Sequence, residues 1–151
     1  MIEFFVAGEP RPQGSKRAFM GKGATRPVMV EQGGEGLKGW RLRLAATVAS
    51  FAPSTGPLSD PVGVTIVFRM PVPKSRKNEW PIARNRGDID KLCRAVLDEL
   101  TGVLIVDDAQ VVMLGASKVY APDEPPGARI CVWTRAEELA LLAEPVPIVS
   151  V

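Results

Sequence analysis

Two pairs of aspartates, Asp88 with Asp90 and Asp107 with Asp108, are the residues of this 151-residue sequence whose type and spacing could do chemistry. The chain contains no histidine, which removes the commonest general base and most zinc sites. Crowded carboxylates oppose one another's ionisation, and a divalent cation relieves that cost. Mg²⁺ prefers oxygen ligands and commonly binds one or two carboxylates together with phosphate. The aspartates therefore indicate a magnesium site suited to phosphodiester hydrolysis.

Arg94 follows Asp90 by four residues, so on an ideal helix the two side chains share one face. A guanidinium there could contact the attacked phosphate and stabilise its added charge. Ordinary interpretations of these residues stay open. Asp88 could cap a helix, Asp90 and Arg94 could form a surface ion pair, and Asp107 with Asp108 could form a solvated turn.

The element that must position the first aspartate pair is a helix opening at Asp88. Its apolar residues, from Ile89 to Leu100, recur at spacings of three and four, and Gly102 is a plausible stop. A short apolar run then leads to the second aspartate pair. If the start of the helix and the end of that run are neighbours, three or four carboxylates converge.

The remaining elements surround this helix and give the fold class. Strands are expected over Ile2 to Ala7, Val62 to Arg69, Gln110 to Tyr120 and Arg129 to Trp133. Helices are expected over Leu37 to Phe51 and, as a short last element, Arg135 to Ala143. This order predicts a single α+β domain over residues 1–143, with two main helices packed on a small mixed sheet and a tail over 144–151.

Charge is segregated along the chain, which favours a polyanionic partner. Residues 1–86 hold fourteen Lys and Arg against six Asp and Glu, whereas residues 87–151 hold five against eleven. This split indicates a basic surface beside an acidic cluster, although solvated faces of different sign would also explain it. Pro10 to Gly36 is interpreted as a basic, flexible loop. The predicted DNA contacts in the basic part are Lys16, Arg17, Lys74, Arg76, Lys77, Arg84 and Arg86.

Composition is typical of a globular chain, with no apolar run of about 18 residues that would span a bilayer. No membrane partner and no organic cofactor are expected. The apolar start of the chain does not follow a secretion pattern, so a cytoplasmic location is expected. Cys93 and Cys131 are interpreted as reduced thiols without a chemical role.

Five segments of the sequence resemble the RusA family of Holliday junction resolvases, which is common in bacteria and their prophages. Together they cover nearly the whole chain except its tail, and the two acidic motifs at this separation are the most distinctive. The segments are GEPRPQGSKRAF (Gly8 to Phe19), PVGVTIVFRMP (Pro61 to Pro71), GDIDKLCRAVLDELTG (Gly87 to Gly102), VDDAQV (Val106 to Val111) and PGARICVW (Pro126 to Trp133).

The resemblance implies a homodimer that binds four-way DNA junctions and nicks two opposed strands with Mg²⁺ or Mn²⁺. It also implies that Asp88, Asp90 and Asp108 are the catalytic metal ligands, supported by Asp107. A two-fold dimer matches the symmetry of such a junction. The cell would be a bacterium or a phage-infected bacterium, and the process DNA recombination, repair or phage DNA processing.

Two positions depart from the family pattern. Arg94 stands where a catalytic lysine is usual, and Lys91 stands where an asparagine is usual and adds a cation beside the metal. Lys91 joins Lys16 and Arg17 among the expected phosphate contacts. Three alternatives stay open: a non-catalytic protein that binds branched DNA, a metal-dependent nuclease for flaps, forks or RNA, and a structural domain that binds cations adventitiously.

Overall fold

The computed structural model describes residues 1–14, 16–19, 23, 25–26, 28–31, 34–75, 78–83 and 87–137. Four predicted DNA contacts, Arg76, Lys77, Arg84 and Arg86, lie outside the described residues. So do the tail 144–151 and most of the last helix predicted over 135–143, of which residues 135–137 are helical. Within the described part of the chain, no helix is long and apolar enough to cross a membrane.

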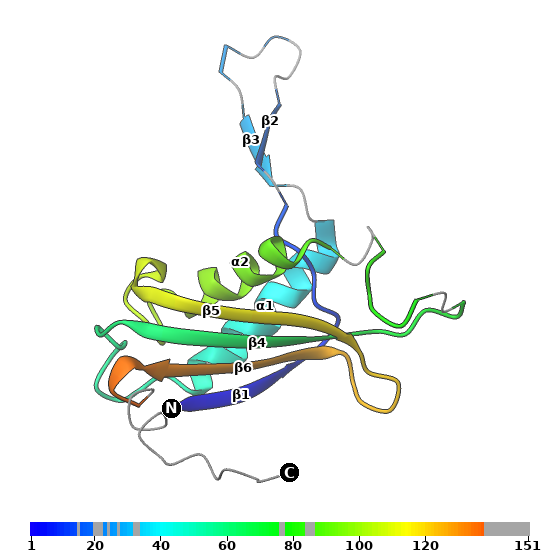
Figure 1. The fold of residues 1–151 in the computed structure, drawn as a ribbon. Coiled ribbons are helices and arrows are strands. Elements are labelled where there is room, and N and C mark those ends of the chain that lie inside the picture. Colours follow the sequence, from blue (N-terminus) through cyan, green and yellow to red (C-terminus); the bar gives the residue numbers. More distant parts are fainter. Residues whose placement is uncertain are drawn as a thin grey trace, which may run out of the picture.

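The main sheet has four strands in the order β1 (Ile2–Ala7), β6 (Gly127–Thr134), β4 (Val62–Met70) and β5 (Val111–Tyr120). The β1–β6 and β6–β4 pairs are antiparallel, whereas β4 and β5 are parallel. The sheet is therefore mixed, and the predicted α+β class is confirmed (Figure 1). All four predicted strands are present, with ends that differ by at most two residues.

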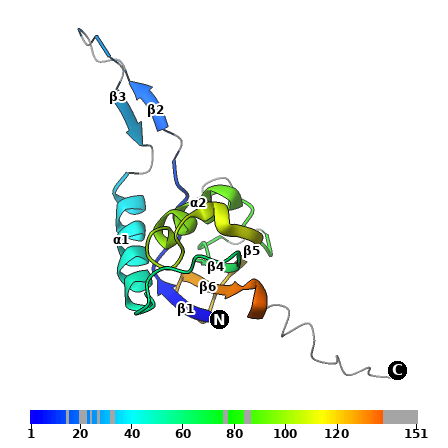
Figure 2. The same cartoon turned by 90° about the vertical axis from the view of Figure 1, so that its left-hand side faces the viewer.

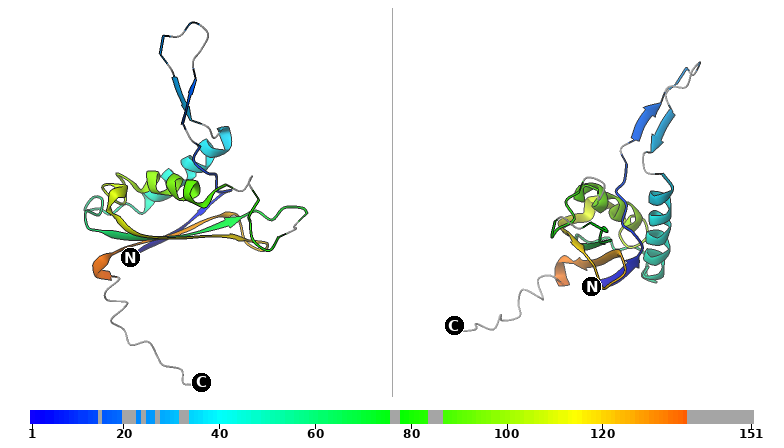
Figure 3. Two further views of the ribbon diagram at one scale, coloured as in Figure 1. Left: turned by 45° about the horizontal axis from the view of Figure 1, so that its top comes forward. Right: turned by 90° about the vertical axis from the view of Figure 1, so that its right-hand side faces the viewer.

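Both main helices, α1 (Gly34–Ser50) and α2 (Ile89–Leu100), cover the same face of this sheet (Figures 1 and 3). Parallel neighbours such as β4 and β5 need a crossover connection, and α2 lies in that connection. Gly102, just beyond α2, has a φ of +77°, a backbone conformation that glycine adopts without steric cost. The crossover places α2 in the helix layer over the sheet and β5 at the edge of the sheet, where the two elements contact each other.

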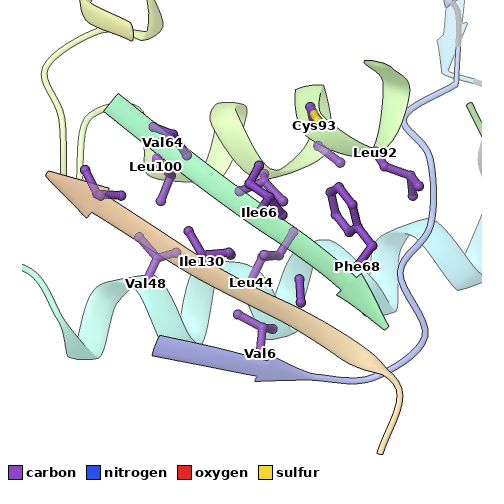
Figure 4. Packing of buried hydrophobic residues seen from close by; sticks show 14 of the residues in the cluster. Val6, Leu44, Val48, Val64, Ile66, Phe68, Leu92, Cys93, Leu100 and Ile130 are labelled. Atoms are coloured by element: carbon purple, nitrogen blue, oxygen red, sulfur yellow. The ribbon is translucent and has the colours of Figure 1, made fainter. Parts of the chain in front are cut away.

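The core lies between the two helices and the covered face of the sheet (Figure 4). Strand β4 alternates as its sequence predicts, because Val64, Ile66 and Phe68 are buried while Thr65 and Val67 are only partly so. The helix residues buried in this core are Leu37, Trp40, Leu44, Val48, Leu92, Cys93, Ala95, Val96 and Leu100.

The opposite face of the sheet carries smaller contacts. The guanidinium carbon of Arg69 lies 5.2 Å from the centre of the Phe5 ring. The Trp133 ring lies against Gly63, where an added Cβ would come within 2.4 Å of it. A glycine is therefore required at position 63 for Trp133 to keep this place.

The segment interpreted as a loop over 10–36 contains an antiparallel hairpin of β2 (Lys16–Phe19) and β3 (Val28–Glu31), so that interpretation is wrong in part. Each strand has only four residues, too few for the alternation to be recognised among the surrounding Gly and Pro. The hairpin projects from the body of the protein as an arm (Figure 2). The backbone of Lys16 and Arg17 lies on this arm.

Candidate active site

A pocket of about 360 Å³ lies between α2, β5 and the short 3-10 helix η2 (Asp108–Gln110). Its charged side chains are Asp90, Arg94 and Asp108, and the rest of the lining is apolar. The apolar residues that line it are Ile89, Cys93, Leu97, Leu114 and Ala116. The pocket therefore combines two carboxylates and a guanidinium over an apolar floor.

Amphipathicity of α2 turns Asp90 and Arg94 toward this pocket. Leu92 and Val96 are fully buried in the core, which leaves Asp90 and Arg94 exposed on another face of the helix. The two residues are one helical turn apart, and both line the pocket as their spacing predicts. The first turn also carries a negative charge where the helix dipole favours it.

The two aspartates of the second pair have different roles: Asp107 caps a helix, whereas Asp108 lines the pocket. The Asp107 carboxylate accepts a hydrogen bond of 2.8 Å from the Ala109 amide and so caps η2. Asp108, the next residue, is exposed and lines the pocket. The structure therefore brings Asp108, and not Asp107, to the pocket that Asp90 lines.

Gln110 anchors this turn, a role that was not predicted from the sequence. Its Oε1 accepts a hydrogen bond of 2.8 Å from the Asp107 amide, and its Nε2 donates to the carbonyls of Leu58 and Asp60 at 3.0 and 2.9 Å. An acidic cap followed three residues later by Gln is a capping-box pattern, so Asp107 and Gln110 could have been paired from the sequence. The contacts to Leu58 and Asp60 have no sequence signal.

Asp88 lies at the N-terminus of α2 but its side chain makes no capping hydrogen bond. Instead, its Oδ2 accepts a side-chain hydrogen bond of 2.9 Å from Lys91 Nζ. This hydrogen bond is the main cause that lowers the pKa of the Asp88 carboxyl, and the same contact raises the pKa of Lys91. Neither residue lines the pocket, although Asp88 stands two positions before Asp90.

The backbone that carries Asp88 is held from two sides. Gly87 has a φ of +80°, and an added Cβ would lie 2.8 Å from the Pro12 ring. Lys118 of β5 donates a hydrogen bond of 2.8 Å to the Gly87 carbonyl, and its charge also lowers the pKa of Asp88 slightly. No pattern in the sequence pointed to Lys118.

The donor chemistry of the pocket fits Mg²⁺, which keeps several waters and needs only one or two carboxylates beside a phosphate. The expectation that three or four carboxylates converge is not met. Among the described residues there is no group of three or more acidic, cysteine or histidine side chains placed to hold a metal ion. Asp107 is used as a cap and Asp88 is paired with Lys91, so Asp90 and Asp108 are the two that share the pocket.

The other predicted contacts lie away from the pocket. Lys74 is exposed in the connection after β4, and Lys16 and Arg17 belong to the arm. Cys93 lines the pocket, but burial raises the pKa of its thiol, so it remains protonated near neutral pH. Both Cys93 and Cys131 are free thiols, as predicted.

An acidic pocket between a crossover helix and the parallel strand that follows it, in a protein that also has a projecting arm carrying Lys16 and Arg17, is an arrangement suited to a nucleic-acid hydrolase. Comparison with known proteins agrees with this class. A family model described as Endodeoxyribonuclease RusA matches residues 8–132. The chain is also similar to the uncharacterised protein YqaN of Bacillus subtilis (strain 168), with 31% identity over 134 residues that cover 82% of this chain and 90% of YqaN.

The chain therefore belongs to the RusA family of endodeoxyribonucleases, and the predicted resemblance is confirmed. Membership of this family implies a nuclease of the Holliday junction resolvase type. The matched residues 8–132 include the arm, both main helices and the whole pocket lining.

Proposed function

We propose that this protein is a magnesium-dependent endonuclease that resolves four-way DNA junctions by paired nicks, with Asp90 and Asp108 as its central metal ligands. The observation that carries the proposal is that these two carboxylates, from α2 and from η2, line one pocket together with Arg94. Mn²⁺ has similar ligand preferences and is proposed as a substitute. Asp88 stands at the margin of the site as a third ligand, and Asp107 holds the turn that presents Asp108.

A bound Mg²⁺ would supply Lewis-acid stabilisation of phosphate charge and a lower pKa for an attacking water. The residues of the chain would hold the metal and position the phosphate. Asp90 and Asp108 would hold the cation at the pocket. Arg94 is one helical turn from Asp90, so its guanidinium can donate to the oxygens of a phosphate seated between them. The apolar floor of Ile89 and Leu97 would limit water around that phosphate.

Nicking of synthetic DNA by Asp90→Asn and Asp108→Asn tests this assignment. Each substitution removes a charged ligand and keeps the size of the side chain, so Mg²⁺-dependent nicking of a four-way junction should fall at least about 100-fold while junction binding stays within about threefold. Asp107→Asn is the control, because an amide oxygen can still accept from the Ala109 amide. Wild-type nicking by both variants would overturn the assignment.

The same assay on matched junction, fork, flap and linear duplex substrates measures which DNA structure the protein cleaves preferentially. Paired nicks on the junction that exceed those on the other substrates are the expected result. Equal cleavage of all four would favour a general metal-dependent nuclease. Stable binding to the junction with Mg²⁺ and no nicks would favour a non-catalytic protein that binds branched DNA.

DNA binding is proposed to use the arm and the basic connection after β4. Lys16 and Arg17 are on β2 of the arm, and the exposed Lys74 begins the connection. Each phosphate neutralised by such a residue adds about 0.9 to the slope of log affinity against log salt. The variant Lys16→Ala/Arg17→Ala should therefore weaken junction binding and lower that slope by about two, whereas unchanged binding and slope would exclude the arm.

A homodimer is proposed to form through β5. This strand is at the edge of the sheet, and its consecutive residues Val112 and Met113, which do not line the pocket, are 65% and 44% exposed. An apolar edge strand of ten residues is a surface for pairing with another strand. A second copy placed there by two-fold symmetry would cover the same residues on both chains.

Sedimentation of Val112→Lys tests this interface. The substitution should convert dimers to monomers because it places a charge in the contact. Leu42→Lys is the matched control, since Leu42 is 73% exposed on α1 and lies outside the proposed contact. A Val112→Lys variant that stays dimeric, or a wild type that is monomeric at micromolar concentration, would contradict the proposal.

A further inference from the structure

Lys91 is paired with a carboxylate at the start of α2. Its Nζ lies 2.9 Å from Asp88 Oδ2, and the side chains are 42% and 67% exposed respectively. The charge of Asp90 also contributes to raising the pKa of Lys91, so the ammonium group senses both carboxylates of the first pair. One cation of the protein thus already neutralises the aspartate that adjoins the pocket.

The ion pair also explains why the Asp88 side chain does not cap α2. An aspartate at the N-cap normally accepts from a backbone amide of the first turn, yet Asp88 makes no such bond. The backbone before Asp88 is held at Gly87, partly by the hydrogen bond from Lys118, so the Asp88 side chain can change its hydrogen-bond partner while the backbone stays in place. Lys91, one turn along α2, is that partner.

We propose that Lys91 is an internal counterion of Asp88 that sets the metal affinity of the pocket, because Asp88 joins the cation site only when this ion pair opens. This inference rests on the proposed function, since it takes the pocket of Asp90 and Asp108 as the metal site. It replaces the DNA contact predicted for Lys91 from the sequence. The ion pair and the added positive charge both oppose cation binding, so Lys91 adjusts metal affinity and is not a catalytic residue.

Calorimetric titration of the metal-free protein with Mn²⁺, without DNA, measures this effect apart from activity. Lys91→Met removes the charge and keeps an unbranched side chain with good helix propensity. Loss of an exposed ion pair and of one positive charge near a divalent cation should lower the Mn²⁺ dissociation constant about three- to tenfold. Lys91→Arg retains the charge and should stay within about twofold of the wild type.

The matched control is Lys38→Met. Lys38 pairs with Glu35 at the same spacing of three residues and the same 2.9 Å at the start of α1, and neither lines the pocket. The Lys38→Met variant should bind Mn²⁺ as the wild type does. In an Asp88→Asn background, Lys91→Met should increase Mn²⁺ affinity by at most about half as much as it does in the wild type, because the ion pair is already absent.

Two failures are distinguishable in this titration. If Asp90→Asn and Asp108→Asn leave Mn²⁺ binding unchanged, the pocket is not the metal site and the proposed function fails. If those variants lose binding while Lys91→Met keeps the wild-type dissociation constant, only the role of Lys91 is overturned. Weaker junction binding by Lys91→Met at unchanged Mn²⁺ affinity would show instead that Lys91 contacts a DNA phosphate, as the sequence predicted.

Discussion

Replacing Gln110 by alanine removes the three hydrogen bonds that hold the turn presenting Asp108. The contact from the Asp107 amide closes the capping box, and the two contacts to the Leu58 and Asp60 carbonyls tie the turn to the segment before β4. The Leu58 carbonyl keeps a second donor, the Val106 amide at 3.1 Å, so it is not left without a partner. The substitution therefore loosens the turn and leaves its surroundings largely satisfied.

The magnitude follows from the exposure of each contact. A net contribution of about 1 kcal/mol fits the half-buried bond to Leu58, and about 0.5 kcal/mol each fits the two exposed bonds, which water can replace. The free energy of unfolding should thus fall by about 2 kcal/mol, which corresponds to about 4–8 °C in Tm for a chain of this size. Nicking should fall further than stability implies, because Asp108 loses its fixed position.

Thermal unfolding followed by circular dichroism, together with junction nicking below the transition, measures both effects. Gln110→Met is the companion variant, because it keeps the volume of the side chain and loses the same three hydrogen bonds. Ser50→Ala, which removes one exposed hydrogen bond to the Thr47 carbonyl, is the background control. A Gln110→Ala variant with a Tm within about 1 °C of the wild type and with equal activity would show that these hydrogen bonds do not hold the turn.

Three further predictions concern other parts of the structure. Gly63→Ala should lower the free energy of unfolding by about 1–3 kcal/mol, since its Cβ would meet the Trp133 ring; an unchanged urea midpoint would contradict this. Cys93 should react slowly with iodoacetamide at pH 7 and faster as pH rises, because burial raises the pKa of its thiol; alkylation as fast as in the denatured chain would show that it is not buried. The Asp88 carboxyl should titrate below its ordinary pKa by NMR, and its pKa should rise in Lys91→Met because the hydrogen bond and charge of Lys91 are the largest causes of the lowering. The stabilisation from this pair is therefore present above the ordinary pKa and disappears as pH falls through the lowered one. The same titration midpoint in both proteins would exclude the ion pair in solution.

The elements that position the site were predictable because their hydrophobic periodicity is regular. The apolar spacing of α2 predicted both its bounds and the shared face of Asp90 and Arg94. Alternation along β4 likewise predicted the buried face of the central strand. The hairpin of β2 and β3 was missed, since two strands of four residues carry too little alternation to stand out.

Within the site, the spacing of the aspartates did not separate their functions, although the family resemblance set Asp107 apart in a supporting role. Four carboxylates at two element ends were equivalent by spacing, whereas the structure divides them by local hydrogen bonding. Asp107 caps η2, Asp88 pairs with Lys91, and Asp90 and Asp108 share the pocket. Such a division depends on side-chain partners that are brought together by the fold, and a linear pattern contains only part of that information.

In this member of the RusA family, Asp90 and Asp108 are proposed to bind one divalent cation together. Anomalous diffraction from a crystal grown with Mn²⁺ would locate this metal without reference to activity. We expect an anomalous peak in the pocket within about 2.3 Å of an oxygen of each of these carboxylates. A peak that contacts only one of the two carboxylates, or a pocket without a peak at saturating Mn²⁺, would contradict this proposal.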